Sequence, residues 1–181
     1  MPESSEHSPK LKSVLVTGAS GLIGTDLLDS IKSTHEVRTY GRKLIAGFKG
    51  IKGELSDRTA IDTAMNNINT VVHLAAMAGV RASVDQPALY FDVNVSGTLN
   101  LLEGTQKNGK PNFVFASTSS AYGRTERVPF TETDVADRPL APYPASKRSV
   151  ELLGHAYHHM HGVDFTAVRF FTVYGLSLIH I

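Results

Sequence analysis

The sequence predicts an α/β fold in which a parallel, doubly wound β-sheet carries helices on both faces. Three observations indicate this fold. Short β-branched or apolar runs alternate with stretches of helical periodicity along the chain. The run at residues 70–74 has continuous apolar residues, as in a strand buried on both faces. A glycine-rich turn separates the first strand-like run from the first helical stretch.

The elements follow one another in a regular order. Residues 13–17 form the first expected strand, and apolar residues then recur at helical spacing from Leu22 to Ile31. Further strands are expected at residues 36–40, 48–55, 70–74, 112–116 and 165–171. Long helices are expected at residues 87–107, where Pro87 suits a first turn, and at residues 144–161.

Length and composition restrict the class of protein. A chain of 181 residues, 41% of them hydrophobic, favours one domain, expected at residues 13–175 after a disordered polar tail at 1–12. The net charge of +1 is scattered, so we expect no nucleic acid partner. No apolar run approaches the roughly 20 residues that span a bilayer, and no cysteine is present. We expect a cytoplasmic protein without membrane contact.

The turn after the first strand predicts a dinucleotide site. Glycines at 18, 21 and 24 give the spacing GxxGxxG between a strand and a helix, the context in which such a motif is informative. Glycine permits a tight turn, and the helix N-terminus offers free amides to a pyrophosphate. The expected contacts are Gly18, Ser20, Gly21, Leu22, Ile23 and Gly24. The alternative is a strand-to-helix turn without a ligand.

The end of the second strand leaves the choice of cofactor open. The acidic residue that would bind the adenosine ribose is absent, and Arg42 and Lys43 stand there instead. Arg42 is a candidate contact to a 2′-phosphate, which would favour NADP over NAD. Two solvated basic residues in a surface loop are the alternative interpretation.

Three residues form a candidate catalytic set. Tyr143 and Lys147 are one helical turn apart, so both side chains can face one site, and Thr118 follows a buried strand. A nearby ammonium is expected to lower the pKa of the Tyr143 phenol and make it a usable base. Thr118 can orient the reacting hydroxyl. The alternative is a strand end rich in Ser and Thr followed by an ordinary amphipathic helix.

In these motifs the chain resembles the extended short-chain dehydrogenases/reductases, also called the NAD-dependent epimerase/dehydratase family. The matching motifs are the glycine turn, His73-Leu74-Ala75-Ala76, Asn94, and the set Thr118, Tyr143 and Lys147. The resemblance implies a Rossmann-type domain, bound NAD and a smaller C-terminal substrate domain that is missing here. It implies further cofactor contacts at Glu54, Leu55, Leu74, Ala75, Ala76, Asn94, Tyr143, Lys147 and Phe171. Glu54 and Leu55 stand where the family has Gly-Asp.

Within the family, residues 75–81 and 169–175 resemble UDP-glucuronate 4-epimerases. This implies an isomerase that inverts carbon 4 through a 4-keto intermediate and works as a homodimer. The implied substrate contacts are Thr118, Ser119, Ser120, Tyr143 and Thr172. Ser120 replaces the Glu that decarboxylases and dehydratases of the family usually have. The alternatives are an NAD(P)-dependent reductase, another nucleotide-sugar enzyme of the family, and a non-catalytic dinucleotide-binding module.

Two further features lead to negative expectations. Residues 176–181 depart from the family pattern after Gly175, so we expect them to be a non-native tail on a fragment that is inactive alone. Four histidines crowd residues 155–161, and His155 and His159 have the spacing of a metal pair. A third ligand is not evident, and we expect no metal site.

Overall fold

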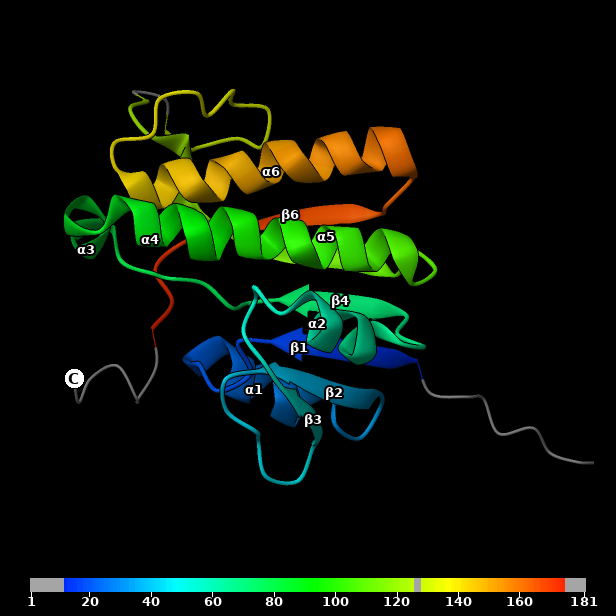
Figure 1. Ribbon diagram of the computed structural model, residues 1–181. Coiled ribbons are helices and arrows are strands. Elements are labelled where there is room, and N and C mark those ends of the chain that lie inside the picture. Colours follow the sequence, from blue (N-terminus) through cyan, green and yellow to red (C-terminus); the bar gives the residue numbers. More distant parts are fainter. Residues whose placement is uncertain (1–11, 126–127, 175–181) are drawn as a thin grey trace, which may run out of the picture.

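Six parallel strands form one sheet in the computed structural model, which describes residues 12–125 and 128–174. The strands are β1 (Ser13–Thr17), β2 (Glu36–Gly41), β3 (Lys49–Lys52), β4 (Thr70–His73), β5 (Asn112–Thr118) and β6 (Phe165–Phe170). Their order is β3-β2-β1-β4-β5-β6 (Figure 1). The chain therefore reverses its direction across the sheet between β1 and β4, and a sheet of this order binds ligands outside the carboxyl ends of its strands at that point.

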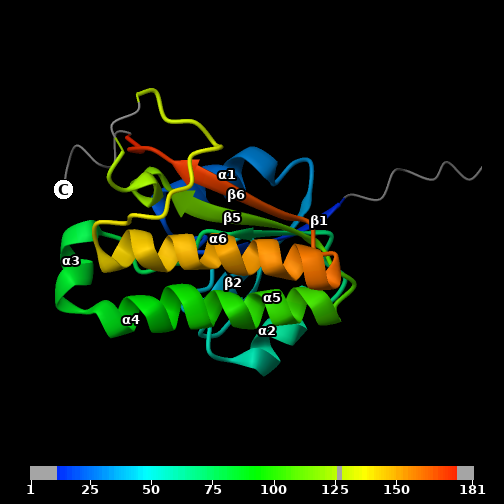
Figure 2. The same cartoon turned by 90° about the horizontal axis from the view of Figure 1, so that it is seen from above.

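Helices cover the two faces of the sheet unequally. They are α1 (Leu22–Ile31), α2 (Arg58–Met65), α3 (Val80–Asp85), α4 (Pro87–Phe91), a π-helical turn η1 (Asp92–Ser96), α5 (Gly97–Lys107), a 3-10 turn η2 (Ser119–Tyr122) and α6 (Pro142–His161). Figure 2 shows α2, α5 and α6 on one face and α1 on the other. None of the helices in the described ranges is both long and apolar enough to cross a membrane.

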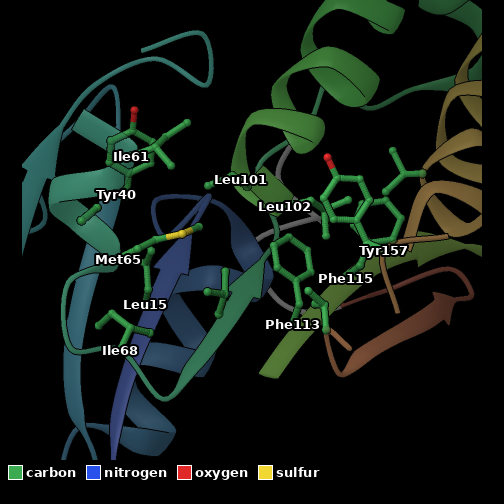
Figure 3. Packing of buried hydrophobic residues seen from close by; sticks show 14 residues of the cluster. Leu15, Tyr40, Ile61, Met65, Ile68, Leu101, Leu102, Phe113, Phe115 and Tyr157 are labelled. Carbon is green, nitrogen blue, oxygen red and sulfur yellow. The ribbon is translucent and has the colours of Figure 1, made fainter. Parts of the chain in front are cut away.

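The alternation of side chains along β1 divides the core into two parts. Leu15 is fully buried in the cluster under α2, α5 and α6 (Figure 3). Its neighbours Val14 and Val16 point to the opposite face and pack with Leu28 of α1. Burying one such side chain contributes roughly 1.5–3 kcal/mol. Both faces of β1 are apolar for this reason, and the strand shows no polar alternation.

The fold class and the six strands are confirmed, with differences in detail. The third strand is only Lys49–Lys52 instead of 48–55, although the Gly53 amide that follows it still donates to the Gly41 carbonyl. The helix expected at 87–107 contains the π-helical turn. The short helices α2 and α3 were not predicted, since eight and six residues give too little periodicity. The second face is covered by α1 over β1 and β2, and Val168 of β6 stays exposed.

We predict that Gly154→Ala destabilises the fold although alanine favours helix. A Cβ at position 154 would overlap the Phe165 ring, which stacks on Phe113 and Phe115 and cannot easily move. Overpacking of this kind costs about 1–3 kcal/mol, more than the roughly 0.5–1 kcal/mol that alanine gains in a helix. Chemical denaturation should show the loss, while His159→Ala on the exposed side of α6 should change stability little. A more stable Gly154→Ala variant would contradict this packing.

Candidate active site

A cavity of about 380 Å³ lies at the carboxyl ends of β1, β2, β3 and β4. The predicted cofactor residues that line it are Gly18, Ser20, Gly21, Arg42, Glu54, Leu55, Leu74, Ala75 and Ala76. Lining residues that were not predicted include Tyr40, Gly53, Met77 and Val93. The signal that points to these residues is their position just after a strand end or beside a predicted contact. Leu22, Ile23 and Gly24 do not line the cavity.

The glycine turn brings the loops after β1 and β4 into contact. Gly18 has a φ of +69°, and a Cβ there would lie 2.5 Å from the Ala75 amide nitrogen. A Cβ at Gly24 would overlap Gly18 and Ala19, so this glycine lets α1 approach the turn. The first turn of α1 begins after Gly21 and has no side-chain cap. Open amides beside a backbone cradle fit the pyrophosphate of a dinucleotide.

The rim of the cavity after β2 is basic. Arg42 and Lys43 line it, and no acidic side chain follows β2 directly. Below the rim the buried Tyr40 hydroxyl donates a 2.6 Å hydrogen bond to the Glu54 carbonyl, which ties β2 to the loop after β3. Burial, with the nearby Asp57 and Glu54, raises the pKa of Tyr40 to about 12, so its hydroxyl stays a donor.

The three predicted catalytic residues lie together at the end of β5 and the start of α6. The side chains of Thr118 and Tyr143 lie close enough for the Thr118 hydroxyl to act on the pKa of the Tyr143 phenol. Lys147, one turn further along α6, donates a 2.8 Å hydrogen bond from Nζ to the Ala116 carbonyl. The same ammonium lies 4.6 Å from the centroid of the Phe115 ring. The side chains that carry the expected chemistry therefore face one another across β5 and α6.

Burial sets the protonation of this pair in a way that the sequence did not predict. Burial raises the pKa of Tyr143 and outweighs the opposing effect of the Thr118 hydrogen bond. Burial also lowers the pKa of Lys147 to about 7. The expected lowering of the phenol pKa by Lys147 is therefore absent from the protein alone. Because burial removes both side chains from water, the charged form of either one is costly here.

Asn94 connects the cavity loop to the catalytic helix instead of lining the cavity. It lies in the π-helical turn, where its Oδ1 accepts a 2.8 Å hydrogen bond from the Met77 amide. Its Nδ2 donates to the Met77 carbonyl at 3.0 Å and to Ser146 Oγ at 2.9 Å. Ser146 in turn donates to the Tyr143 carbonyl at 2.7 Å. The structure thus gives Asn94 a structural role, and its contact with the cofactor stays a prediction.

The last predicted residues lie further from the cavity. Ser119 and Ser120 begin η2 directly after Thr118, and the Ser120 amide donates to Thr118 Oγ1 at 3.2 Å. Phe171 is 61% exposed and stacks on Phe130, 5.9 Å between ring centroids, so it does not reach the cavity wall. Thr172 is also exposed. The expected tails at 1–12 and 176–181 lie outside the described ranges, except for Lys12.

An ionic cluster behind the catalytic residues was also missed. Glu151 of α6 accepts hydrogen bonds from Ser117 of β5 at 2.5 Å and from Arg148 at 2.8 Å. Arg169 of β6 donates to the same carboxylate at 3.0 and 2.7 Å. Burial acts to raise the pKa of Glu151, but these hydrogen bonds outweigh it and hold the pKa below its ordinary value. A charged Glu151 thus joins β5, α6 and β6.

The histidine cluster does not form a metal site in the part of the chain that the structure describes. His155, His158, His159 and His161 lie at the end of α6. In residues 12–125 and 128–174, no three His, Cys, Asp or Glu side chains are arranged to hold a metal ion. His158 instead forms a 2.9 Å hydrogen bond with the Val163 carbonyl.

Comparison with known proteins agrees with this geometry. Residues 14–178 match the family described as NAD dependent epimerase/dehydratase family. The chain belongs to this family. It is an NAD-dependent family, and its members include isomerases that act on nucleotide sugars.

The similar proteins are nucleotide-sugar epimerases and related structures. A probable UDP-glucuronate 4-epimerase of Rhizobium meliloti is 45% identical over 89% of this chain and 53% of its own length. The structure of MoeE5 with UDP-glucuronic acid and NAD has a TM-score of 0.82 at 37% identity, over 90% of this chain and 56% of that one. The UDP-glucose 4-epimerase of Thermotoga maritima has a TM-score of 0.84 at 30% identity, over 90% and 56%. This chain spans about half the length of the curated relatives that it matches.

We predict that Lys147→Met changes how stability depends on pH. Burial depresses the pKa of Lys147 from 10.5 to about 7, so the unfolded state binds an extra proton between these two values. The stability of the unliganded wild type should therefore rise with pH across this window. The free energy of unfolding of Lys147→Met minus that of wild type should fall by roughly 2–4 kcal/mol from pH 6.5 to 9.5.

The measurement is chemical denaturation at both pH values without cofactor. Lys107→Met is the matched control, because Lys107 lies exposed at the end of α5. Parallel pH profiles for wild type and Lys147→Met would show that the ammonium is not buried as described.

Proposed function

We propose that the protein carrying this chain is a nucleotide-sugar epimerase that inverts carbon 4 of UDP-glucuronate to give UDP-galacturonate with bound NAD. The observation that carries this proposal is the meeting of Thr118, Tyr143 and Lys147 in a fold whose cavity at the carboxyl ends of β1 to β4 is lined by the glycine turn. The likeness to a probable UDP-glucuronate 4-epimerase and to MoeE5 with UDP-glucuronic acid supports the choice of sugar.

In this proposal Tyr143 exchanges the proton of the sugar 4-hydroxyl. Thr118, whose hydroxyl lies close enough to act on the Tyr143 phenol, would orient the sugar hydroxyl for proton transfer. Bound NAD would supply the acceptor and later the donor of the carbon 4 hydride, and its positive ring would favour the phenolate. Lys147 would hold the nicotinamide ribose. The 4-keto sugar turns over in the site, and Tyr143 returns the proton once the other face has been reduced.

Residues around Thr118 support simple epimerisation. The position two residues after Thr118 is Ser120, which cannot act as the extra acid or base that decarboxylation or dehydration would need. The site then has one acid and base, Tyr143, for one exchangeable proton. Substrate contacts at Ser119, Ser120 and Thr172 belong to the same proposal, as does the position of Phe171 near the nicotinamide.

Two further parts of the proposal concern the whole protein, and the first of them rests on the half-length match. We infer that the chain is the cofactor-binding portion of a longer protein whose remainder holds the sugar. We also infer a homodimer formed through the helices that begin at Pro87 and Pro142. Apolar side chains on these helices are exposed in the chain, among them Leu89, Phe91 and Leu152.

An NADP-dependent reductase of the same family is the second candidate, favoured by the basic rim at Arg42 and Lys43. Competition between NAD and NADP for the protein tests the rim directly. A reductase would change nicotinamide absorbance in proportion to turnover, whereas an epimerase leaves no net change. A non-catalytic dinucleotide-binding module would bind nucleotide and keep its function after Tyr143→Phe.

We predict that Tyr143→Phe in the full-length protein lowers the conversion of UDP-glucuronate by about 10²–10⁴-fold, the contribution of a positioned acid–base group. NAD should stay bound, since the ring remains in place. Chromatography of the sugar products measures the conversion. Tyr157→Phe is the matched control, because Tyr157 lies on the same helix in the apolar core. UDP-xylose among the wild-type products would reassign the protein as a decarboxylase.

We predict that the 181-residue chain alone is catalytically silent and poorly soluble. Catalysis needs carbon 4 held near the nicotinamide, and a displacement of about 1 Å can cost on the order of a hundredfold. Exposed apolar residues such as Val168 on β6 also favour aggregation. The test compares the short chain with its full-length parent at equal concentration, with UDP-glucuronate and NAD. Comparable turnover by the short chain would show that the missing portion is not needed.

A further inference from the structure

His73 at the end of β4 is a buried histidine that the proposed reaction does not use. Its side chain is 1% exposed and its ring centroid lies 5.9 Å from those of Phe113 and Phe115. Both ring nitrogens nevertheless meet hydroxyl groups. Nδ1 lies 2.6 Å from Thr17 Oγ1, and Nε2 lies 2.8 Å from Thr98 Oγ1. A phenylalanine would fill this space as well, so the nitrogens need a reason.

The directions of the hydrogen bonds around His73 follow from counting protons. Thr98 has one hydroxyl proton, which it donates to the Asn94 carbonyl at 2.6 Å. Its oxygen must therefore accept the bond from His73, so Nε2 carries a proton. Burial, with the charge of Lys147, lowers the pKa of His73 to about 3, so the ring is neutral and Nδ1 is an acceptor. Thr17 then donates to Nδ1, and its oxygen accepts the Ala75 amide at 3.2 Å.

The result is one directed chain of hydrogen bonds, from the Ala75 amide through Thr17, His73 and Thr98 to the Asn94 carbonyl. Every hydroxyl proton in it has one use. Reversing the histidine tautomer would leave the Thr17 hydroxyl proton without its acceptor at Nδ1, and it would leave Nε2 without a donor unless Thr98 gave up its bond to the Asn94 carbonyl. A buried unsatisfied group of this kind costs about 1–3 kcal/mol, so the tautomer is well determined.

The two ends of this hydrogen-bond chain hold the same short loop. Ala75 is the residue whose backbone Gly18 approaches most closely. At the other end, the Asn94 side chain bonds both the backbone amide and the backbone carbonyl of Met77, two residues further along that loop. Asn94 also reaches Ser146, which bonds the Tyr143 carbonyl. Asn94 thus joins the loop that lines the cofactor cavity to the turn that carries Tyr143, and the His73 ring adds a second connection, between this asparagine and Ala75.

We propose that His73, as the neutral Nε2–H tautomer, is a positioning residue that holds the 75–77 loop against the cofactor cavity and in register with Tyr143. The effect on turnover rests on the proposed function. The effects on the tautomer and on NAD binding do not, because they depend only on the family's cofactor. The competing interpretation is that His73 is an ordinary aromatic residue of the core.

The first test observes the ring directly. Long-range ¹H–¹⁵N spectra of the full-length protein with ¹⁵N-labelled histidine distinguish the two neutral tautomers and the charged form. We expect the Nε2–H pattern for His73, a slowly exchanging Nε2 proton, and a shifted signal in Thr98→Val. The exposed His155 serves as the reference for a solvent-averaged ring. An Nδ1–H or imidazolium pattern for His73 would overturn the proposal.

The second test measures the consequence of interrupting the hydrogen-bond chain at His73 or Thr98. His73→Phe keeps an aromatic ring and Thr98→Val preserves volume. Both variants should melt within a few degrees of wild type, yet bind NAD about tenfold more weakly and turn over about 10–100-fold more slowly with KM nearly unchanged. Thr98→Ser restores the hydroxyl and should recover both values to within about threefold. Thr105→Val is the matched control, because this buried threonine of α5 bonds the Leu101 carbonyl and is not part of the hydrogen-bond chain.

The outcomes separate the two proposals. NAD affinity and turnover that stay at wild-type values in both His73→Phe and Thr98→Val would show that His73 only fills space. If NAD affinity responds as expected but UDP-glucuronate is not converted even by wild type, the hydrogen-bond chain stands and the proposed function fails. Should both variants fail to fold, the tautomer measurement on wild type still decides.

Discussion

The candidate site depends on one close approach, between the glycine turn after β1 and the loop after β4. No side chain fits between Gly18 and Ala75, so the two backbones touch at the point where the strand order reverses. Gly18, Leu74 and Ala75 all line the cavity, so this contact forms part of its wall. A Cβ at position 18 would push the β4 loop away, and the helical layer that bonds to this loop would have to follow.

On the other side of β4 the site is stabilised by buried polar groups that each have several partners. Lys147 bonds the Ala116 carbonyl and faces the Phe115 ring, and Glu151 one turn later gathers Ser117 and Arg169. The catalytic end of α6 is thus joined to β5 and β6 by charge-assisted hydrogen bonds at two successive turns. Such bonds hold a helix at a defined depth and rotation, which apolar packing alone does less well.

Sequence reasoning reached the fold because its signals were local. The continuous apolar runs, the glycine turn and the spacing of Tyr143 and Lys147 each lie within a few residues, and each has a direct structural counterpart. It failed where the cause was not local. The pKa values of Tyr143 and Lys147 depend on burial under the whole layer, and the partners of His73 and Glu151 come from strands and helices far away in the chain. The role of Asn94 depends on a π-helical turn, which cannot be predicted from residue composition.

That wide turn has a consequence for how the surface of the long helical segment should be mapped. The π-helical turn at Asp92–Ser96 takes up about one residue more than an α-helical turn, and one residue corresponds to about 100° of rotation around a helix axis. The faces of α4 and α5 are therefore out of phase, although the ribbon in Figure 1 runs on without a break. A single helical wheel drawn through residues 87–107 assigns residues of α4 to the wrong side. Loss of one residue within the turn would rotate the whole α4 surface relative to the sheet while every other contact of α5 stayed in place.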